Sequence, residues 1–163
     1  MTELGSALAQ VFGELVHGPR ARGSATVLNS GDVGLLASLD RLSAQDASRS
    51  TNDGATIAAH AQHLRFGLSL MNDWARVGGD PFANAKWDEA WKVGSVNDEQ
   101  WAEIRAGLRE EAEQWLQALA AAPAHMVKDA SGLIGSIAHL GYHLGAIRQI
   151  HKDTRGPREG TYS

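Results

Sequence analysis

Hydrophobic residues recur at intervals of three and four along most of this chain, which is the period of amphipathic α-helices. Within residues 2–16 these positions are Leu4, Leu8, Val11, Phe12 and Leu15. Thr2 could cap this first helix, and the His-Gly-Pro sequence at 17–19 ends it. The same period returns over residues 32–47 and predicts a shorter helix, which the polar stretch 48–54 interrupts.

Three longer segments with the same period follow. We expect one helix from residue 52 or 53 to 77, another from residue 95 or 97 to 122, and a last one from residue 129 or 131 to about 155. Residues 81–96 show mixed periodicity and predict a connection with at most one helical turn. No segment alternates polar and apolar residues, so no sheet is expected. The chain is therefore predicted to be all-α, an up-down four-helix bundle with one extra short helix between helices 1 and 2, with residues 1–163 forming a single domain.

Composition narrows the functional classes. The 163 residues are 43% hydrophobic and 21% charged, which suits a globular domain with its own core. A net charge of -4, without a stripe of Lys and Arg, argues against nucleic acid as a partner. The sequence shows neither a basic leader before an apolar stretch nor a membrane span, so we expect a cytoplasmic protein without membrane contact. Because there is no cysteine, any metal must be held by nitrogen and oxygen.

Histidines supply the candidate chemistry, and seven occur in the chain. His139 and His143 are four residues apart on the last predicted helix, so their rings share a face one turn apart, beside the hydrophobic stripe. Such a pair can chelate a metal, although two hydrogen-bonded or solvated imidazoles would show the same spacing. Leu140 follows His139 where a zinc metalloprotease would have its catalytic Glu, so that class is disfavoured.

A third imidazole would turn this pair into a metal site, because three protein nitrogens plus exchangeable water are typical of catalytic zinc. The helix predicted from residue 52 or 53 to 77 offers His60 and His63, which are three residues apart and share a face. Spacing alone allows either one to meet the pair across the bundle, or both to be polar residues at a helix edge.

Two short stretches resemble motifs of the DinB/YfiT-like family of metal-dependent enzymes. Residues 56–64, TIAAHAQHL, are similar to the family's second-helix motif, in which a histidine before an aliphatic residue is the first ligand. Residues 139–148, HLGYHLGAIR, are similar to its fourth-helix motif, which supplies two more. The resemblance implies His63, His139 and His143 as ligands. His60 is additional to the motif, and Ala146 stands where many relatives have glutamine.

The resemblance also implies a function. Members of this family hold one divalent metal ion, variously zinc, nickel or iron, and often form homodimers; some are S-transferases that use bacillithiol or mycothiol, and one is a mycothiol-dependent maleylpyruvate isomerase. We therefore expect a thiol-dependent S-transferase acting on a small molecule. The absence of cysteine requires that the low-molecular-weight thiol come from outside.

Three alternatives stay open from the sequence. The first is a metal-dependent hydrolase. The second is a non-enzymatic stress-response protein that binds a metal or ligand, which a bundle without a pocket beside the histidines would favour. In the third, the histidines are incidental to a structural protein.

The sequence also predicts where several other side chains lie. Trp87 and Trp91 lie in the connection 81–96, where they could cover a pocket, although tryptophans most often pack in a core. Tyr142 should point away from the face that carries the histidine pair. Arg148 is expected at a solvated C-terminal end. No partner is predicted for three histidines: His17, His125 and His151.

Overall fold

A computed structural model describes residues 3–21 and 24–158, and in these residues it contains helices and no strand. The elements are α1 (Glu3–His17), α2 (Gly34–Asp40), α3 (Ala44–Ala47), α4 (Ile57–Val77), α5 (Trp87–Ala90), α6 (Asp98–Ala121), α7 (Ala124–Val127), α8 (Ala130–Ile150) and the 3-10 turn η1 (Lys152–Thr154). The predicted all-α helical bundle is confirmed. Thr2, the expected cap of the first helix, lies outside the described residues.

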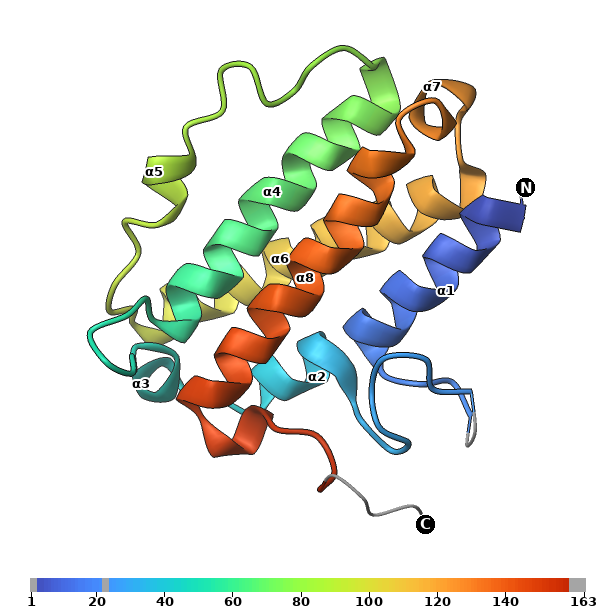
Figure 1. The fold of residues 1–163 in the computed structure, drawn as a ribbon. Helices are drawn as coiled ribbons and strands as arrows, with labels where there is room; N and C mark the ends of the chain where they lie inside the picture. Colours follow the sequence, from blue (N-terminus) through green and yellow to red (C-terminus); the bar gives the residue numbers. More distant parts are fainter. Residues whose placement is uncertain (1–2, 22–23, 159–163) are drawn as a thin grey trace.

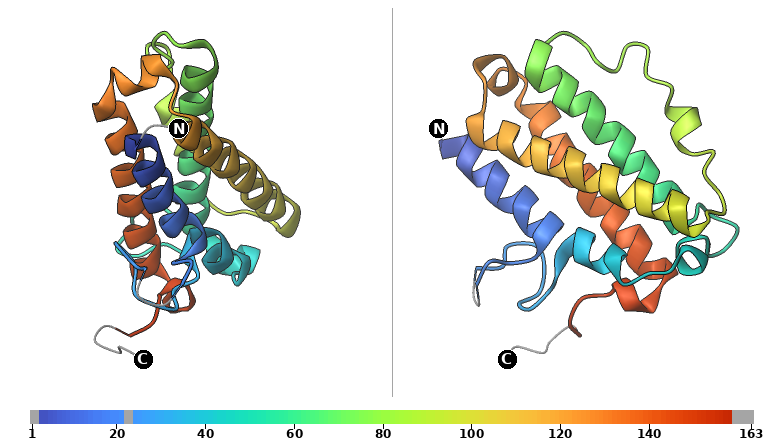
Figure 2. Two further views of the ribbon diagram at one scale, coloured as in Figure 1. Left: turned by 90° about the vertical axis from the view of Figure 1, so that its right-hand side faces the viewer. Right: turned by 180° about the vertical axis from the view of Figure 1, so that it is seen from behind.

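Four long helices form the bundle (Figure 1). α4 packs against α6 and α8, and α1 packs against the same two helices, so the four surround one core of mostly Leu, Ala and Trp side chains. The connection 78–97 runs back along the outside of α4 (Figures 1 and 2). As a result α4 and α6 run in the same direction, whereas α1 and α8 run in the opposite one. In the described residues no helix is long and apolar enough to cross a membrane.

The short helix predicted over residues 32–47 is two helices, α2 and α3, which residues 41–43 separate. Trp101 donates its indole N–H to the carbonyl of Leu42 at 2.9 Å. The carbonyl of Leu42 therefore accepts a hydrogen bond from a distant side chain. Ser43 then starts α3 as the N-cap of a capping box with Asp46. A tertiary hydrogen bond therefore divides a segment that its hydrophobic pattern presents as continuous.

The start of α4 also differs from the prediction. Asn52 and Asp53 both have positive φ angles, 53° and 56°, which a helix does not accommodate. α4 begins instead at Ile57, where the Thr56 hydroxyl accepts a hydrogen bond from the N–H of Ala59 at 3.1 Å. The starts of α6 and α8 agree with expectation, because Asn97 and Asp129 cap them.

A close backbone crossing fixes the end of α1 against the start of α2. Gly18 and Gly34 have φ angles of +85° and +72°, and a Cβ on Gly34 would lie 2.4 Å from the nitrogen of Gly18. No side chain fits at that distance. The crossing leaves the Asp32 side chain 1% exposed, where it meets Arg148 of α8.

Arg148 is not at a solvated end, and that expectation is wrong. Its Nη2 donates to both carboxylate oxygens of Asp32 at 2.8 Å, and Asp32 also accepts the N–H of Gly34 at 2.9 Å. The Arg148 side chain is only 17% exposed. A half-buried ion pair thus ties the loop before α2 to the last turns of α8.

Removal of one member of this pair should destabilise the fold. We expect Asp32→Ala to lower the free energy of unfolding by about 3 kcal/mol, because it leaves a guanidinium without a partner in a mostly dry environment. Asp40→Ala is the matched control: Asp40 pairs with Arg105 and Arg109 at the surface and should contribute less than about 1 kcal/mol. Urea unfolding followed by circular dichroism measures both, and equal effects would contradict the assignment.

Candidate metal centre

Four histidines meet where α4 and α8 lie side by side (Figure 1). α4 supplies His60 and His63 from its first two turns, and α8 supplies His139 and His143. His60, His63 and His143 are buried, whereas His139 is partly exposed. The spacings seen in the sequence therefore place all four rings between the two helices.

Three of the four rings bring nitrogen atoms to one point. Nε2 of His139 lies 3.0 Å from Nε2 of His63 and 3.0 Å from Nε2 of His143. One ligand atom from each of these residues lies within 4.8 Å of the other two. The group is the set of three that the family resemblance implies, and it could hold a metal ion.

Hydrogen bonding alone cannot account for this convergence. A ring nitrogen carries either one hydrogen or one lone pair, so Nε2 of His139 can make a linear hydrogen bond to one of its two neighbours and not to both. A cation accepts all three lone pairs. For nitrogens about 2.0–2.1 Å from zinc, neighbouring ligand atoms are separated by about 2.9 Å at right angles and about 3.4 Å in a tetrahedron. The observed 3.0 Å separations fit that range.

His60 occupies a different position, which the sequence could not distinguish from that of a ligand. Its Nδ1 lies 2.8 Å from Nδ1 of His143, the nitrogen of that ring that faces away from the other two. If Nε2 of His143 offers a lone pair to an ion, Nδ1 of His143 must carry the hydrogen and donate it to His60. His60 would then fix the tautomer and orientation of a ligand, as a hydrogen-bond partner commonly does at metal sites.

Burial keeps these imidazoles neutral. Desolvation, together with the smaller effect of the neighbouring histidines, lowers the pKa of His143 to about 3 and that of His63 to about 4. Desolvation also lowers the pKa of His60 and of His139. At neutral pH all four rings therefore have the free lone pair that metal binding requires.

Aromatic side chains of the connection 78–97 cover the histidines. Trp91 stacks on His63 with a centroid separation of 4.2 Å and 24° between planes, and its ring meets His60 edge-on at 5.4 Å. Trp87 lies 5.3 Å from His63. Of the two positions that the sequence allows, a core or a cover over a pocket, these tryptophans therefore take the second. Tyr142 points outward as predicted and is 71% exposed.

The site lacks an acidic partner. Within residues 3–21 and 24–158, no Asp or Glu forms a hydrogen bond or ion pair with any of the four histidines, and Nδ1 of His63 is buried without a hydrogen-bond partner. The remaining histidines bind elsewhere, His17 to Glu113, His125 to the carbonyl of Trp74 and His151 to Asp46. The site is therefore a cluster of neutral rings without a carboxylate.

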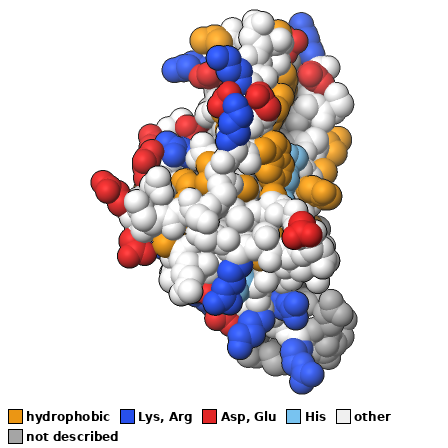
Figure 3. Space-filling model, turned by 90° about the vertical axis from the view of Figure 1, so that its left-hand side faces the viewer, with side chains coloured by type: hydrophobic (Ala, Val, Ile, Leu, Met, Phe, Trp, Pro, Cys, Tyr) orange, Lys and Arg blue, Asp and Glu red, His pale blue; other side chains and the backbone are white. Residues whose placement is uncertain are grey.

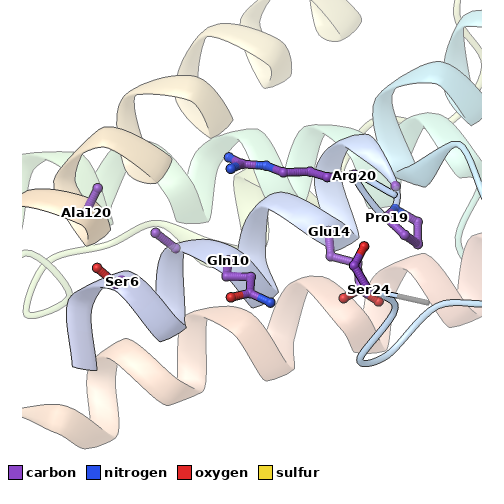
Figure 4. A pocket seen from close by; sticks show the side chains of 9 residues that line it. Ser6, Gln10, Glu14, Pro19, Arg20, Ser24 and Ala120 are labelled. Atoms are coloured by element: carbon purple, nitrogen blue, oxygen red, sulfur yellow. The ribbon is translucent and has the colours of Figure 1, made fainter. Parts of the chain in front are cut away.

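A second buried acid, Glu14, lines a hollow of about 450 Å³ beside α1 (Figure 4). Its carboxylate accepts the backbone N–H groups of Thr26, Val27 and Leu28 at 2.7–3.0 Å. Burial raises the pKa of Glu14, but these donors outweigh it and the pKa is lowered. The carboxylate holds the loop that follows α1, and this explains its burial without a ligand.

Comparison with protein-family models, curated proteins and solved structures finds no significant match for this chain. The resemblance of residues 56–64 and 139–148 to DinB/YfiT-like motifs therefore stays a prediction. The geometry of the histidines is the independent observation that bears on it.

Metal content tests the assignment of the three ligands. Protein prepared without a histidine tag and loaded with zinc or nickel should contain about one ion per chain, and His63→Ala and His143→Ala should abolish it. His60→Ala should keep the ion but weaken its affinity about 10- to 100-fold, because the partner of His143 is lost. Elemental mass spectrometry and calorimetry measure these quantities. Wild-type affinity in His60→Ala would show that His60 has no influence on the site.

The buried rings also predict a pH dependence for the metal-free protein. An unfolded chain protonates its histidines near the ordinary pKa of 6.5, whereas in the folded protein His63 resists protonation until about pH 4. Because the unfolded state then binds more protons, the free energy of unfolding should fall as the pH drops from 6.5 toward 4. Urea unfolding in the presence of a chelator measures this fall, which should be shallower in His143→Gln and unchanged in His17→Gln. A stability independent of pH over this interval would contradict the burial argument.

Proposed function

We propose that this protein is a metal-dependent enzyme of the DinB/YfiT-like type that joins an external low-molecular-weight thiol, through its sulfur, to a small electrophile. The thiol loses its proton, and the new carbon–sulfur bond replaces the bond to the electrophile's leaving group. The observation that carries the proposal is the convergence of three neutral imidazole nitrogens, from His63, His139 and His143, on one point. Three protein ligands leave further positions for an exchangeable group, which is the arrangement of catalytic rather than structural metal sites.

Each residue has a separate task in this proposal. His63 and His143, which are buried, and His139, which is partly exposed, would hold the ion, and the exposed edge of His139 would leave access to it. A bound divalent ion lowers the pKa of a coordinated thiol, so that the thiolate is available at neutral pH. Trp91 and Trp87 cover His63 and limit the entry of water. The thiol itself must be supplied by a cosubstrate, because the chain has no cysteine.

Two observations favour thiol transfer over the alternatives. Hydrolysis usually relies on a carboxylate or similar base to position water, and none contacts the histidines in the described part of the chain. An ion lowers the pKa of either ligand, but a coordinated thiol is deprotonated more readily than a coordinated water because its pKa starts lower. A protein that merely sequesters metal would need no room for a substrate, yet a cavity of about 290 Å³ adjoins His139.

A thiol-consumption assay tests the proposal. Zinc-, nickel- or iron-loaded protein should accelerate the reaction of mycothiol or bacillithiol with monobromobimane, followed by loss of free thiol. We expect a rate at least about tenfold above the uncatalysed reaction in wild type and in His17→Ala. The variant His143→Ala should fall to the background rate, because it lacks a ligand. A rate equal to background for the fully loaded wild type, with every thiol and metal tried, would reject thiol transfer.

A further inference from the structure

A cavity next to the histidines has mainly apolar walls. It has a volume of about 290 Å³ and lies between α4 and α8, next to the connection 78–97. Its main walls are Leu64, Leu68 and Met71 of α4, Leu140 of α8, and Phe82 and Trp87 of the connection. His139 also lines it. A molecule in this cavity would therefore lie against the ring of a candidate metal ligand.

The cavity offers no compensation for a charge. None of the residues that line it is charged. The hydroxyl of Ser136, its other polar side chain, donates to the carbonyl of Leu133 at 2.7 Å and accepts the indole N–H of Trp115 at 3.0 Å. A charged ligand would lose its hydration here without gaining a partner. In the space-filling view, a histidine surface is visible between groups of hydrophobic side chains (Figure 3).

The volume and the aromatic walls limit the shape of the occupant. A dry cavity of about 150 Å³ holds one benzene ring, so a cavity of this volume has room for about two rings. The rings of Phe82 and Trp87 lie nearly parallel, 15° apart with centroids 6.1 Å apart, and Trp87 lines the cavity with its flat indole. Such walls favour a flat apolar group over a branched or hydrated one.

We propose that this cavity binds the uncharged, flat apolar part of the electrophilic substrate, about the size of two fused rings, with the reacting end at His139. The identity of the bound molecule as a substrate rests on the proposed thiol transfer. Binding of an apolar group in this cavity does not depend on thiol transfer, because leucine, methionine and aromatic side chains form the surface that contacts the group. The thiol, which is more polar, would reach the ion from the exposed side of His139.

Gly67 gives a specific way to fill the cavity. This residue lies in the interior of α4, and a Cβ added to it would lie 3.6 Å from Cε1 of His139 and 3.7 Å from Cη2 of Trp87. These are ordinary van der Waals contacts, so Gly67→Ala should fold without displacing either ring, and alanine is favoured over glycine in a helix. The added methyl group occupies space at the boundary between the cavity and His139.

Gly141 provides a matched control on α8. Its added Cβ would lie 3.8 Å from Cδ1 of Leu15, also an ordinary contact, and Gly141 does not line the cavity. Gly141→Ala therefore makes the same chemical change at a helical site of similar space, away from the proposed ligand.

The test uses metal-free protein, so that binding is separated from metal loading and from thiol chemistry. We expect 2-naphthol to shift the indole N–H signal of Trp87 in a nitrogen-15 NMR spectrum, with the signal assigned through Trp87→Phe. Naphthalene-2-sulfonate, which has the same rings and a negative charge, should bind at least about tenfold more weakly. Gly67→Ala should weaken 2-naphthol binding at least about tenfold, whereas Gly141→Ala should leave it unchanged.

Each result separates the two proposals. Absence of 2-naphthol binding, equal binding of the sulfonate, or wild-type binding by Gly67→Ala would overturn the assignment of the cavity. Wild-type metal affinity in Gly67→Ala, together with weakened 2-naphthol binding, would support the assignment of the cavity and show that His63, His139 and His143 still bind metal. An inactive thiol assay alongside intact 2-naphthol binding would reject thiol transfer and leave an apolar binding site beside the metal centre.

Discussion

The packing of α4 against α8 is the constraint on which the candidate site depends, because it brings four imidazoles together between two helices and buries three of them. Polar rings removed from water must find partners, and these rings find them mainly in one another. The cluster cannot be satisfied by hydrogen bonds alone, since Nε2 of His139 faces two ring nitrogens at 3.0 Å. The same burial keeps the rings neutral. A single packing arrangement thus produces both the unsatisfied nitrogens and the protonation state in which they can bind a cation.

The crossover between α4 and α6 explains how the site is covered. In a strictly alternating bundle a short turn would join successive helices at one end, and no chain would pass over the outer side of α4. Here residues 78–97 return along the length of α4, so that α6 starts at the same end as α4 (Figure 2). This return places Trp87 and Trp91 over His63. The topology therefore accounts for an aromatic cover that no bundle helix supplies.

The sequence pattern predicts the long helices and places the histidines of α4 and α8 on faces that can meet, but it fails where distant residues act. Helical periodicity is a local property, so four long helices follow from it directly. The break between α2 and α3 does not, because the indole of Trp101 causes it from 59 residues away. Likewise Asp32 and Arg148 are 116 residues apart, and no local pattern shows that they pair. His60 and His63 look equivalent by spacing, and only the directions of their rings distinguish them. Nε2 of His63 faces His139, whereas Nδ1 of His60 contacts the far side of the His143 ring.

The absence of acidic groups from the described site has a consequence for the chemistry it favours. Three neutral imidazoles would leave the charge of a divalent ion uncompensated, and the surrounding apolar and aromatic side chains provide little dielectric screening. Under these conditions an anionic fourth ligand is favoured more strongly than a neutral one, since it lowers the net charge of a poorly solvated site. A thiol satisfies this requirement more readily than water does, because its pKa starts near 8.5 rather than 15.7. If this protein carries out the proposed thiol transfer, the lack of carboxylates around the ion would therefore favour a bound thiolate over a neutral ligand.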